Sequence, residues 1–127
     1  MSQSASQAAA FFRDVARTGR LWTVRDEGGY PAPYGSTGGR AQPFWSTESR
    51  VRRIIKLVPA YAAFDAEELD LTQWRDHWLP NFRKSGIRLG INWSGPRAAG
   101  YDFTPDEVQN RLAAQGLATW SRPPAEG

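Results

Sequence analysis

The stretch GIRLGINWSG, residues 86–95, constrains the fold most strongly, because its apolar residues recur at every second position. The members of this apolar set are Ile87, Leu89, Ile91 and Trp93. A period of two predicts a β-strand with one apolar face. Glycine stands before the stretch and Ser-Gly-Pro follows it, which is typical of strand ends. Tyr101 and Phe103 come after the turn, so we expect a short strand over residues 100–103 that pairs back onto the first.

The rest of the chain divides into alternating helical and extended patterns. Apolar residues at helical spacing predict helices over residues 6–17, 47–57, 72–85 and 104–115, and extended patterns predict further strands over 21–26, 42–45 and 68–71. This order of elements predicts an α+β fold, a small, mixed, mainly antiparallel sheet with about four helices packed mostly on one face. We expect one domain over residues 1–117 and a short flexible tail over 118–127.

Several helix ends carry recognisable signals. Ser4 or Ser6 is expected to cap the first helix, and Thr72 the third. Thr104 and Glu107 have the spacing of a capping box. Pro80 lies inside the third helical pattern, where it cannot donate a backbone hydrogen bond, so a kink or break is expected there.

Composition excludes several kinds of chemistry. The 127 residues include no cysteine and one histidine, His77, so a disulfide framework, a thiolate nucleophile and a multi-histidine metal site within the chain are excluded. We expect no cofactor and no metal. The first residues lack the pattern of a secretory signal and no apolar run is long enough to cross a bilayer, so the prediction is a cytoplasmic protein without a membrane partner.

Catalytic residues are not predicted. His77 follows Asp76 within a helical segment, and no Gly-x-Ser-x-Gly elbow is present for it to serve. Carboxylates concentrate in residues 65–70, where they are typical of a solvated strand face. The pattern favours a protein that is not an enzyme.

Six tryptophans are many for this length, and core packing explains most of them. Three differ because each lies on or at the end of a predicted strand beside polar residues. If these strand ends converge, their indoles and polar neighbours form a cleft for a small anionic ligand or a peptide tail. The cleft residues of this hypothesis are Trp22, Arg25, Trp45, Ser46, Arg50, Asn92 and Trp93. Simple packing with turn capping is the alternative interpretation of the same residues.

The loop over residues 28–40 is rich in glycine and proline and carries Tyr30 and Tyr34. Long loops of this kind are often functional. A phosphate-binding loop is rejected because no Gly-Lys-Ser/Thr follows. We expect this loop, with the face near Trp45 and Arg50, to form a contact surface for another protein, since aromatic and arginine side chains commonly anchor such contacts.

Separated motifs together resemble a known family. LWTVRDEGGYPAP, GRAQPFWSTESRVRRIIK, Trp78-Leu79-Pro80 and GINWSG occur in the order seen in the bacterial domain-of-unknown-function family 2750, over roughly residues 8–112. The chain is also distantly similar to the N-terminal domain of SseB-type proteins. The resemblance implies a fold and no activity.

The leading hypothesis is therefore a non-catalytic, cytoplasmic protein-interaction module of a bacterium. A small-ligand binder or weak enzyme that uses the tryptophan and arginine cleft is the first alternative. The second is binding of a phosphate backbone by the basic helix around residues 50–56, which the acidic cluster that follows disfavours, so nucleic acid is not the expected partner.

Overall fold

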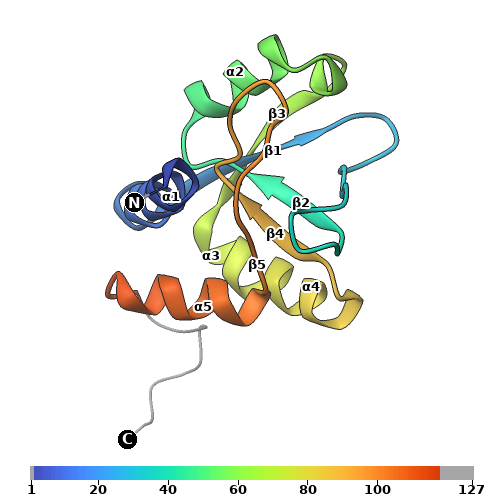
Figure 1. Cartoon of the computed structure of the whole chain (residues 1–127). Helices are drawn as coiled ribbons and strands as arrows, with labels where there is room; N and C mark the ends of the chain where they lie inside the picture. The colour runs from blue at the N-terminus through green and yellow to red at the C-terminus, as the bar shows by residue number, and fades with distance from the viewer. Residues whose placement is uncertain (1, 118–127) are drawn as a thin grey trace, which may run out of the picture.

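The computed structural model describes residues 2–117, and its centre is a pair of small sheets joined edge to edge (Figure 1). In one sheet β1 pairs antiparallel with β3, and in the other β4 pairs parallel with β2 and antiparallel with β5. Two backbone hydrogen bonds of 2.8 Å between Trp22 and Trp45 connect the sheets. The strands are β1 (Arg20–Arg25), β2 (Ala41–Phe44), β3 (Asp65–Asp70), β4 (Arg88–Ile91) and β5 (Asp102–Phe103).

Most of the helices cover one face of these sheets, which we call the covered face. Helices α1, α4 and α5 pack there, with the short α3 and η2, against Leu21, Phe44 and Leu89. The opposite face, called the α2 face, carries Val24 and Ala41 and is covered by α2 and η1. The helical elements are α1 (Gln3–Thr18), α2 (Glu48–Leu57), η1 (Pro59–Tyr61), α3 (Leu71–Gln73), η2 (Trp74–Trp78), α4 (Leu79–Ser85) and α5 (Pro105–Ala114).

This arrangement confirms the predicted α+β class, with mainly antiparallel pairing and helices mostly on one face. Among the described residues, no helix is both long and apolar enough to cross a membrane. The predicted tail over residues 118–127 lies outside the part of the chain that the structure describes.

Helix caps are confirmed where the predicted signal was a complete motif. Thr104 and Glu107 form the predicted capping box at the start of α5. The cap of α1 is Ser2, whose Oγ accepts from the Ala5 N–H at 3.1 Å, so the prediction of Ser4 or Ser6 was wrong. Asp70, rather than Thr72, caps α3, because its carboxylate accepts two backbone N–H groups.

The expected break at Pro80 does not occur. Instead, one wide helical turn, η2, precedes α4, and the Leu79 N–H reaches back to the carbonyl of Trp74. A π-turn of this kind lets the helix accommodate an inserted residue, and Pro80 then lies in the first turn of α4, where a missing N–H costs little. The continuous helix places Trp74, Leu79 and Phe82 in the core of the covered face.

Candidate functional site

Trp93 leaves the apolar face that the alternating pattern of residues 86–95 predicted. Leu89 and Ile91 pack on the covered face, but Trp93 packs on the α2 face. The reason is Asn92, whose φ of 49° lies in the left-handed region and ends the alternation. The prediction of one apolar face was therefore right for Leu89 and Ile91 and wrong for Trp93.

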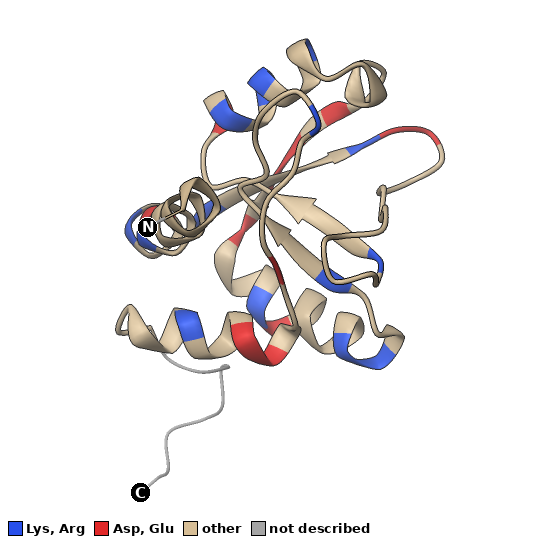
Figure 2. Ribbon diagram, in the orientation of Figure 1, with Lys and Arg blue, Asp and Glu red and all other residues tan. Residues whose placement is uncertain are grey.

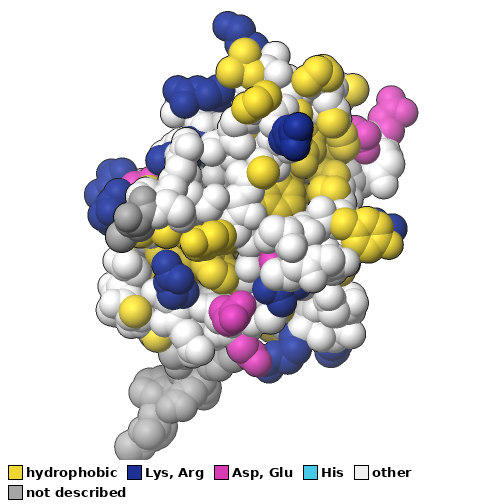
Figure 3. Space-filling view, in the orientation of Figure 1, with side chains coloured by type: hydrophobic (Ala, Val, Ile, Leu, Met, Phe, Trp, Pro, Cys, Tyr) yellow, Lys and Arg dark blue, Asp and Glu magenta, His cyan; other side chains and the backbone are white. Residues whose placement is uncertain are grey.

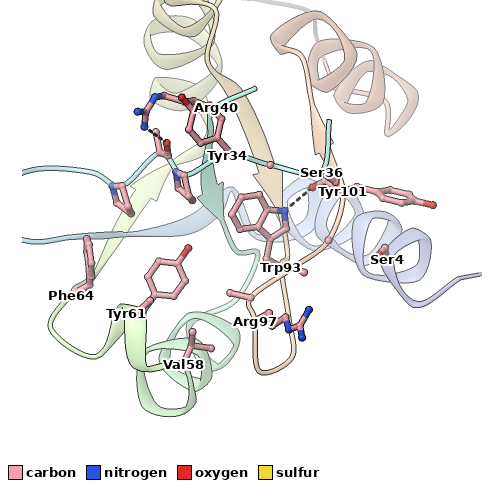
Figure 4. Close-up of a pocket in the computed structure, with 18 residues that line it drawn as sticks. Ser4, Tyr34, Ser36, Arg40, Val58, Tyr61, Phe64, Trp93, Arg97 and Tyr101 are labelled. Carbon is pink, nitrogen blue, oxygen red and sulfur yellow. Dashed lines mark hydrogen bonds between the residues drawn. The ribbon is translucent and has the colours of Figure 1, made fainter. Parts of the chain in front are cut away.

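Two glycines form the seat of the Trp93 indole. A Cβ atom at Gly90 would lie 2.3 Å from the ring, and one at Gly100 would lie 2.9 Å from it. Trp93 Nε1 donates to the carbonyl of Tyr101 at 2.9 Å (Figure 4). The indole is thus fixed between β4 and the segment before β5, with 4% of its surface exposed.

Asn92 and Ser46, two of the predicted site residues, form a buried hydrogen-bond network. Asn92 Oδ1 accepts from the Ser46 N–H at 2.9 Å, and Asn92 Nδ2 donates to Ser46 Oγ at 3.1 Å and to the carbonyl of Gln7 at 3.1 Å. Ser46 Oγ donates to Asp14 Oδ2 at 2.8 Å. These hydrogen bonds tie the ends of β2 and β4 to α1. Each of the polar groups therefore already has a hydrogen-bond partner within the protein.

The three strand-end tryptophans lie on the same face of the sheets without lining one open pocket. Trp45 is fully buried, and its Nε1 donates to the carbonyl of Trp93 at 2.8 Å. Trp22 is half-buried and packs at the margin of the same cluster. Among the described cavities, Trp93 contributes to the walls and Trp22 and Trp45 do not.

Arg25 and Tyr30 lie at a different part of the molecule from Tyr34. The Tyr30 hydroxyl donates to Glu67 Oε2 at 2.6 Å, and its ring packs edge-on against Trp78 with centroids 5.0 Å apart. Arg25 Nη1 lies 3.4 Å from the other Glu67 oxygen, and its guanidinium is 5.6 Å from the Tyr30 ring centroid. Partial burial, followed by the Glu67 carboxylate, raises the pKa of the Tyr30 hydroxyl. The loop after β1 therefore places its two tyrosines in separate environments.

A cleft of about 890 Å³ opens on the α2 face, where three segments meet. One wall is the loop over residues 31–36 with Arg40, the second is the segment 58–64, and the third is the segment 93–101. Figure 3 shows hydrophobic side chains gathered in a hollow on this face, with a positively charged group beside it. The aromatic members of the lining are Tyr34, Tyr61, Phe64, Trp93 and Tyr101.

Tyr61 places a polar atom inside this apolar cleft. Its side chain is 7% exposed, and within residues 2–117 its hydroxyl has no hydrogen-bond partner. Figure 4 shows the hydroxyl pointing into the cleft. Burial raises the pKa of this phenol further above its usual 10.0. The hydroxyl is protonated at neutral pH, as in any tyrosine, and can act as a donor.

The loop wall of the cleft is held by an ion pair whose carboxylate is buried. Asp102 Oδ1 accepts from Arg88 Nε at 2.8 Å and from Thr37 Oγ1 at 3.1 Å. The other oxygen, Oδ2, is packed so closely against Gly35 that a Cβ there would lie 2.0 Å away. At the rim, the Arg40 guanidinium is 4.9 Å from the centroid of the Tyr34 ring, and Arg40 Nη1 donates to the carbonyl of Ala32 at 2.9 Å.

A smaller groove of about 380 Å³ lies on the other side of the turn that follows Trp93. Its walls include Trp93, Ser94, Arg50 and Arg53. Arg50 Nη1 donates to the Gln7 side-chain oxygen, which fixes the guanidinium between α1 and α2. Of the predicted site residues, Arg50 thus joins Trp93 at this groove, and Tyr34 joins Trp93 at the larger cleft.

An acidic hollow lies at the far end of β1 and β3, lined by Arg25 and by carboxylates that include Asp26 and Glu67. Within the described part of the chain, no three His, Cys, Asp or Glu side chains are grouped so that they could hold a metal ion. His77 is exposed on η2 and lines none of the three cavities.

The sequence reasoning did not single out most of the cleft. Tyr61, Phe64 and Arg97 were missed because each lies in a short irregular segment, where no periodic pattern marks one face. A usable signal was present in VPAYAAF, residues 58–64, whose aromatic residues follow a helix-ending proline in a stretch too short for a helix.

The fold and cleft define a small α+β protein with an aromatic-walled cleft between irregular segments on the less covered face of its sheets. The chain belongs to the DUF2750 family, described as proteins of unknown function, whose family model matches residues 8–112. Every cleft-lining residue except Ser4 lies inside this match. No curated protein and no solved structure gave a significant match to the chain. The distant likeness to SseB-type proteins stays a prediction.

Proposed function

We propose that this protein is a non-catalytic interaction module, and that it holds a short peptide segment of a partner protein in the aromatic cleft. The observation that carries the proposal is the cleft itself, which combines aromatic walls with a Tyr61 hydroxyl that has no partner among residues 2–117. Its volume of about 890 Å³ is large enough for several side chains. A cytoplasmic setting in a bacterium is part of the same proposal.

The chemistry of the walls supports a peptide ligand. Rigid aromatic side chains supply contact area at a small cost in conformational entropy, and they anchor many protein interfaces. Tyr34 is 70% exposed at the rim, whereas Trp93 is almost completely buried behind it. An apolar ligand side chain that enters between them loses its contact with water, and the Tyr61 hydroxyl can donate to a ligand carbonyl.

The test is a selection of displayed random peptides against the full chain, followed by binding measurements on a variant with a filled cleft. Ala60 is exposed and lines the cleft, so Ala60→Trp occupies it without disturbing the core. Ala114→Trp, on the exposed side of α5, adds the same indole elsewhere. We expect selected peptides to bind wild type and Ala114→Trp equally, and to lose about tenfold or more in affinity on Ala60→Trp, a change of about 1.4 kcal/mol.

The indole N–H signals in an NMR spectrum locate the binding. A peptide in the cleft shifts the Trp93 signal and leaves the Trp74 signal, from the core of the covered face, in place. Equal affinity for Ala60→Trp and wild type, with both proteins folded, contradicts the proposal.

A further inference from the structure

The walls of the aromatic cleft and of the neighbouring groove contain several arginines. Arg40 and Arg97 line the cleft, and Arg50 and Arg53 line the groove. Within the described residues, no aspartate or glutamate lines either hollow. Figure 2 shows basic residues along α2 and on the segment between β4 and β5, whereas acidic residues lie along β3 and in the loop after β1.

Two arginines of this region differ from the arginines that pair with carboxylates. Arg20, Arg25 and Arg52 each lie within 4.0 Å of a carboxylate. Arg53 and Arg97, by contrast, form no ion pair and no hydrogen bond with any residue in the described part of the chain. The positive charge beside Trp93 is therefore uncompensated by this part of the protein.

The two hollows lie next to each other and share one lining side chain. Trp93 lines both, and the turn over residues 94–99, closed by hydrogen bonds of 3.0 Å between Ser94 and Ala99, forms the ridge between them. A bound peptide that places an apolar side chain in the cleft and crosses this ridge would have Arg97 on one side and Arg53 on the other.

We infer that the segment bound in the cleft is acidic, with an aromatic or aliphatic side chain beside Tyr61 and Trp93 and carboxylates on Arg97 and Arg53. This inference rests on the proposed function and adds the chemical class of the ligand. A guanidinium binds a carboxylate through two parallel hydrogen bonds, and Arg97 and Arg53 have these donors free within the described part of the chain. Complementary charge also accelerates association and disfavours basic partners.

The geometry at Trp93 favours an acidic peptide over a nucleic acid, which the same arginines would also attract. Single-stranded nucleic acids bind by stacking bases on exposed aromatic faces. Trp93 is 4% exposed and its ring is covered by Gly90 and Gly100, so it offers an edge rather than a stacking platform.

The experiment uses two synthetic peptide libraries of equal length, each with one central aromatic or aliphatic residue. The flanking positions are Asp or Glu in one library and Lys or Arg in the other. We expect enrichment from the acidic library and an affinity that falls as salt rises. We expect the double variant Arg53→Gln, Arg97→Gln to bind an enriched peptide with an affinity about tenfold or more lower. The control Arg52→Gln removes a charge paired with Glu48 and should leave the affinity unchanged.

The outcomes separate the inference from the proposed function. In one outcome, peptides lose affinity for Ala60→Trp but show no preference for acidic flanks, and the double variant Arg53→Gln, Arg97→Gln binds them as tightly as wild type. This outcome overturns the inference and leaves the proposed peptide-binding function standing. Peptides that depend on the arginines but bind Ala60→Trp as well as wild type overturn both. A single-stranded RNA oligonucleotide serves as the third arm. If it binds more tightly than every acidic peptide and its binding depends on the same arginines, the inference is overturned in favour of nucleic acid.

Discussion

The two faces of the sheets use aromatic residues in different ways. On the covered face, Phe11, Phe12 and Trp74 are almost completely buried, and the Phe11 ring contacts the other two edge to face, with centroid distances of 5.1 Å to Phe12 and 5.8 Å to Trp74. On the α2 face, Tyr61 and Trp93 are nearly as buried but each contributes an edge or a hydroxyl to the cleft. Burial fraction by itself therefore does not distinguish a core aromatic from a site aromatic.

The difference has a structural cause. Three long helical units close the covered face, whereas one helix and short irregular segments cover the α2 face. Irregular segments pack less regularly than helices and leave a hollow where they meet. The covered face holds the larger cluster of buried apolar residues, and the cleft opens on the α2 face.

The largest expected effect comes from breaking the covered face. Phe11 is completely buried at the contact of α1 with Trp74, so Phe11→Ala leaves a cavity. We expect it to lower the free energy of unfolding by about 3–5 kcal/mol, as measured in urea titrations. In conditions where the variant is still folded, the Trp93 indole signal should stay in place, and its displacement would show that the two faces are not independent.

An intermediate effect is expected where the two faces meet at β4. Gly90→Ala places a methyl group within 2.3 Å of the Trp93 ring, so the indole must move or the strand must shift. We expect a loss of about 1–3 kcal/mol in stability, a shift of the Trp93 indole N–H signal, and weaker peptide binding. Gly39→Ala is the matched control, because its Cβ meets a single atom, in the Arg88 side chain, at an ordinary 3.5 Å. Unchanged stability and an unchanged spectrum for Gly90→Ala would contradict the description of Gly90 as the seat of Trp93.

The smallest effect is expected for the cleft hydroxyl. Tyr61→Phe removes a group with no partner in the described residues, so stability at pH 7 should change by less than about 0.5 kcal/mol, while peptide affinity falls. The comparison with Phe11→Ala separates a residue that stabilises the fold from one that contributes to binding. A large loss of stability for Tyr61→Phe would instead show that the hydroxyl stabilises the fold.

High pH tests the same hydroxyl through linkage. Burial raises the pKa of Tyr61 above its usual 10.0, so the unfolded chain loses this proton first as pH rises. The unfolded state then binds fewer protons than the folded state, and stability falls above about pH 10. Tyr61→Phe should make this fall shallower than in the wild type in urea titrations between pH 9 and pH 11. Identical slopes for wild type and Tyr61→Phe would refute the burial of the phenol.

Local sequence signals predicted the elements well because each depends on neighbours in the chain. The helical spacing of Phe11, Phe12 and Val15, the capping box of Thr104 and the alternation of Leu89 and Ile91 all correspond to observed structure. Predictions were wrong at the caps of α1 and α3, where another polar residue close by caps the helix. They were also wrong where the backbone departed from its regular period: a π-turn before Pro80 replaces the expected break, and Asn92 turns Trp93 to the other face.

The sequence by itself determined the α+β class, the helix and strand positions and the family, because periodicity, capping and motif order are properties of adjacent residues. The tertiary structure alone decided the direction of Trp93 and the meeting of Tyr61, Arg97 and the 31–36 loop at one cleft. One left-handed residue, Asn92, turns the indole to the other face, and that rotation depends on partners in α1 and β2 that are far away in the sequence. GIRLGINWSG thus provides a core strand in its first half and a wall of the candidate site in its second.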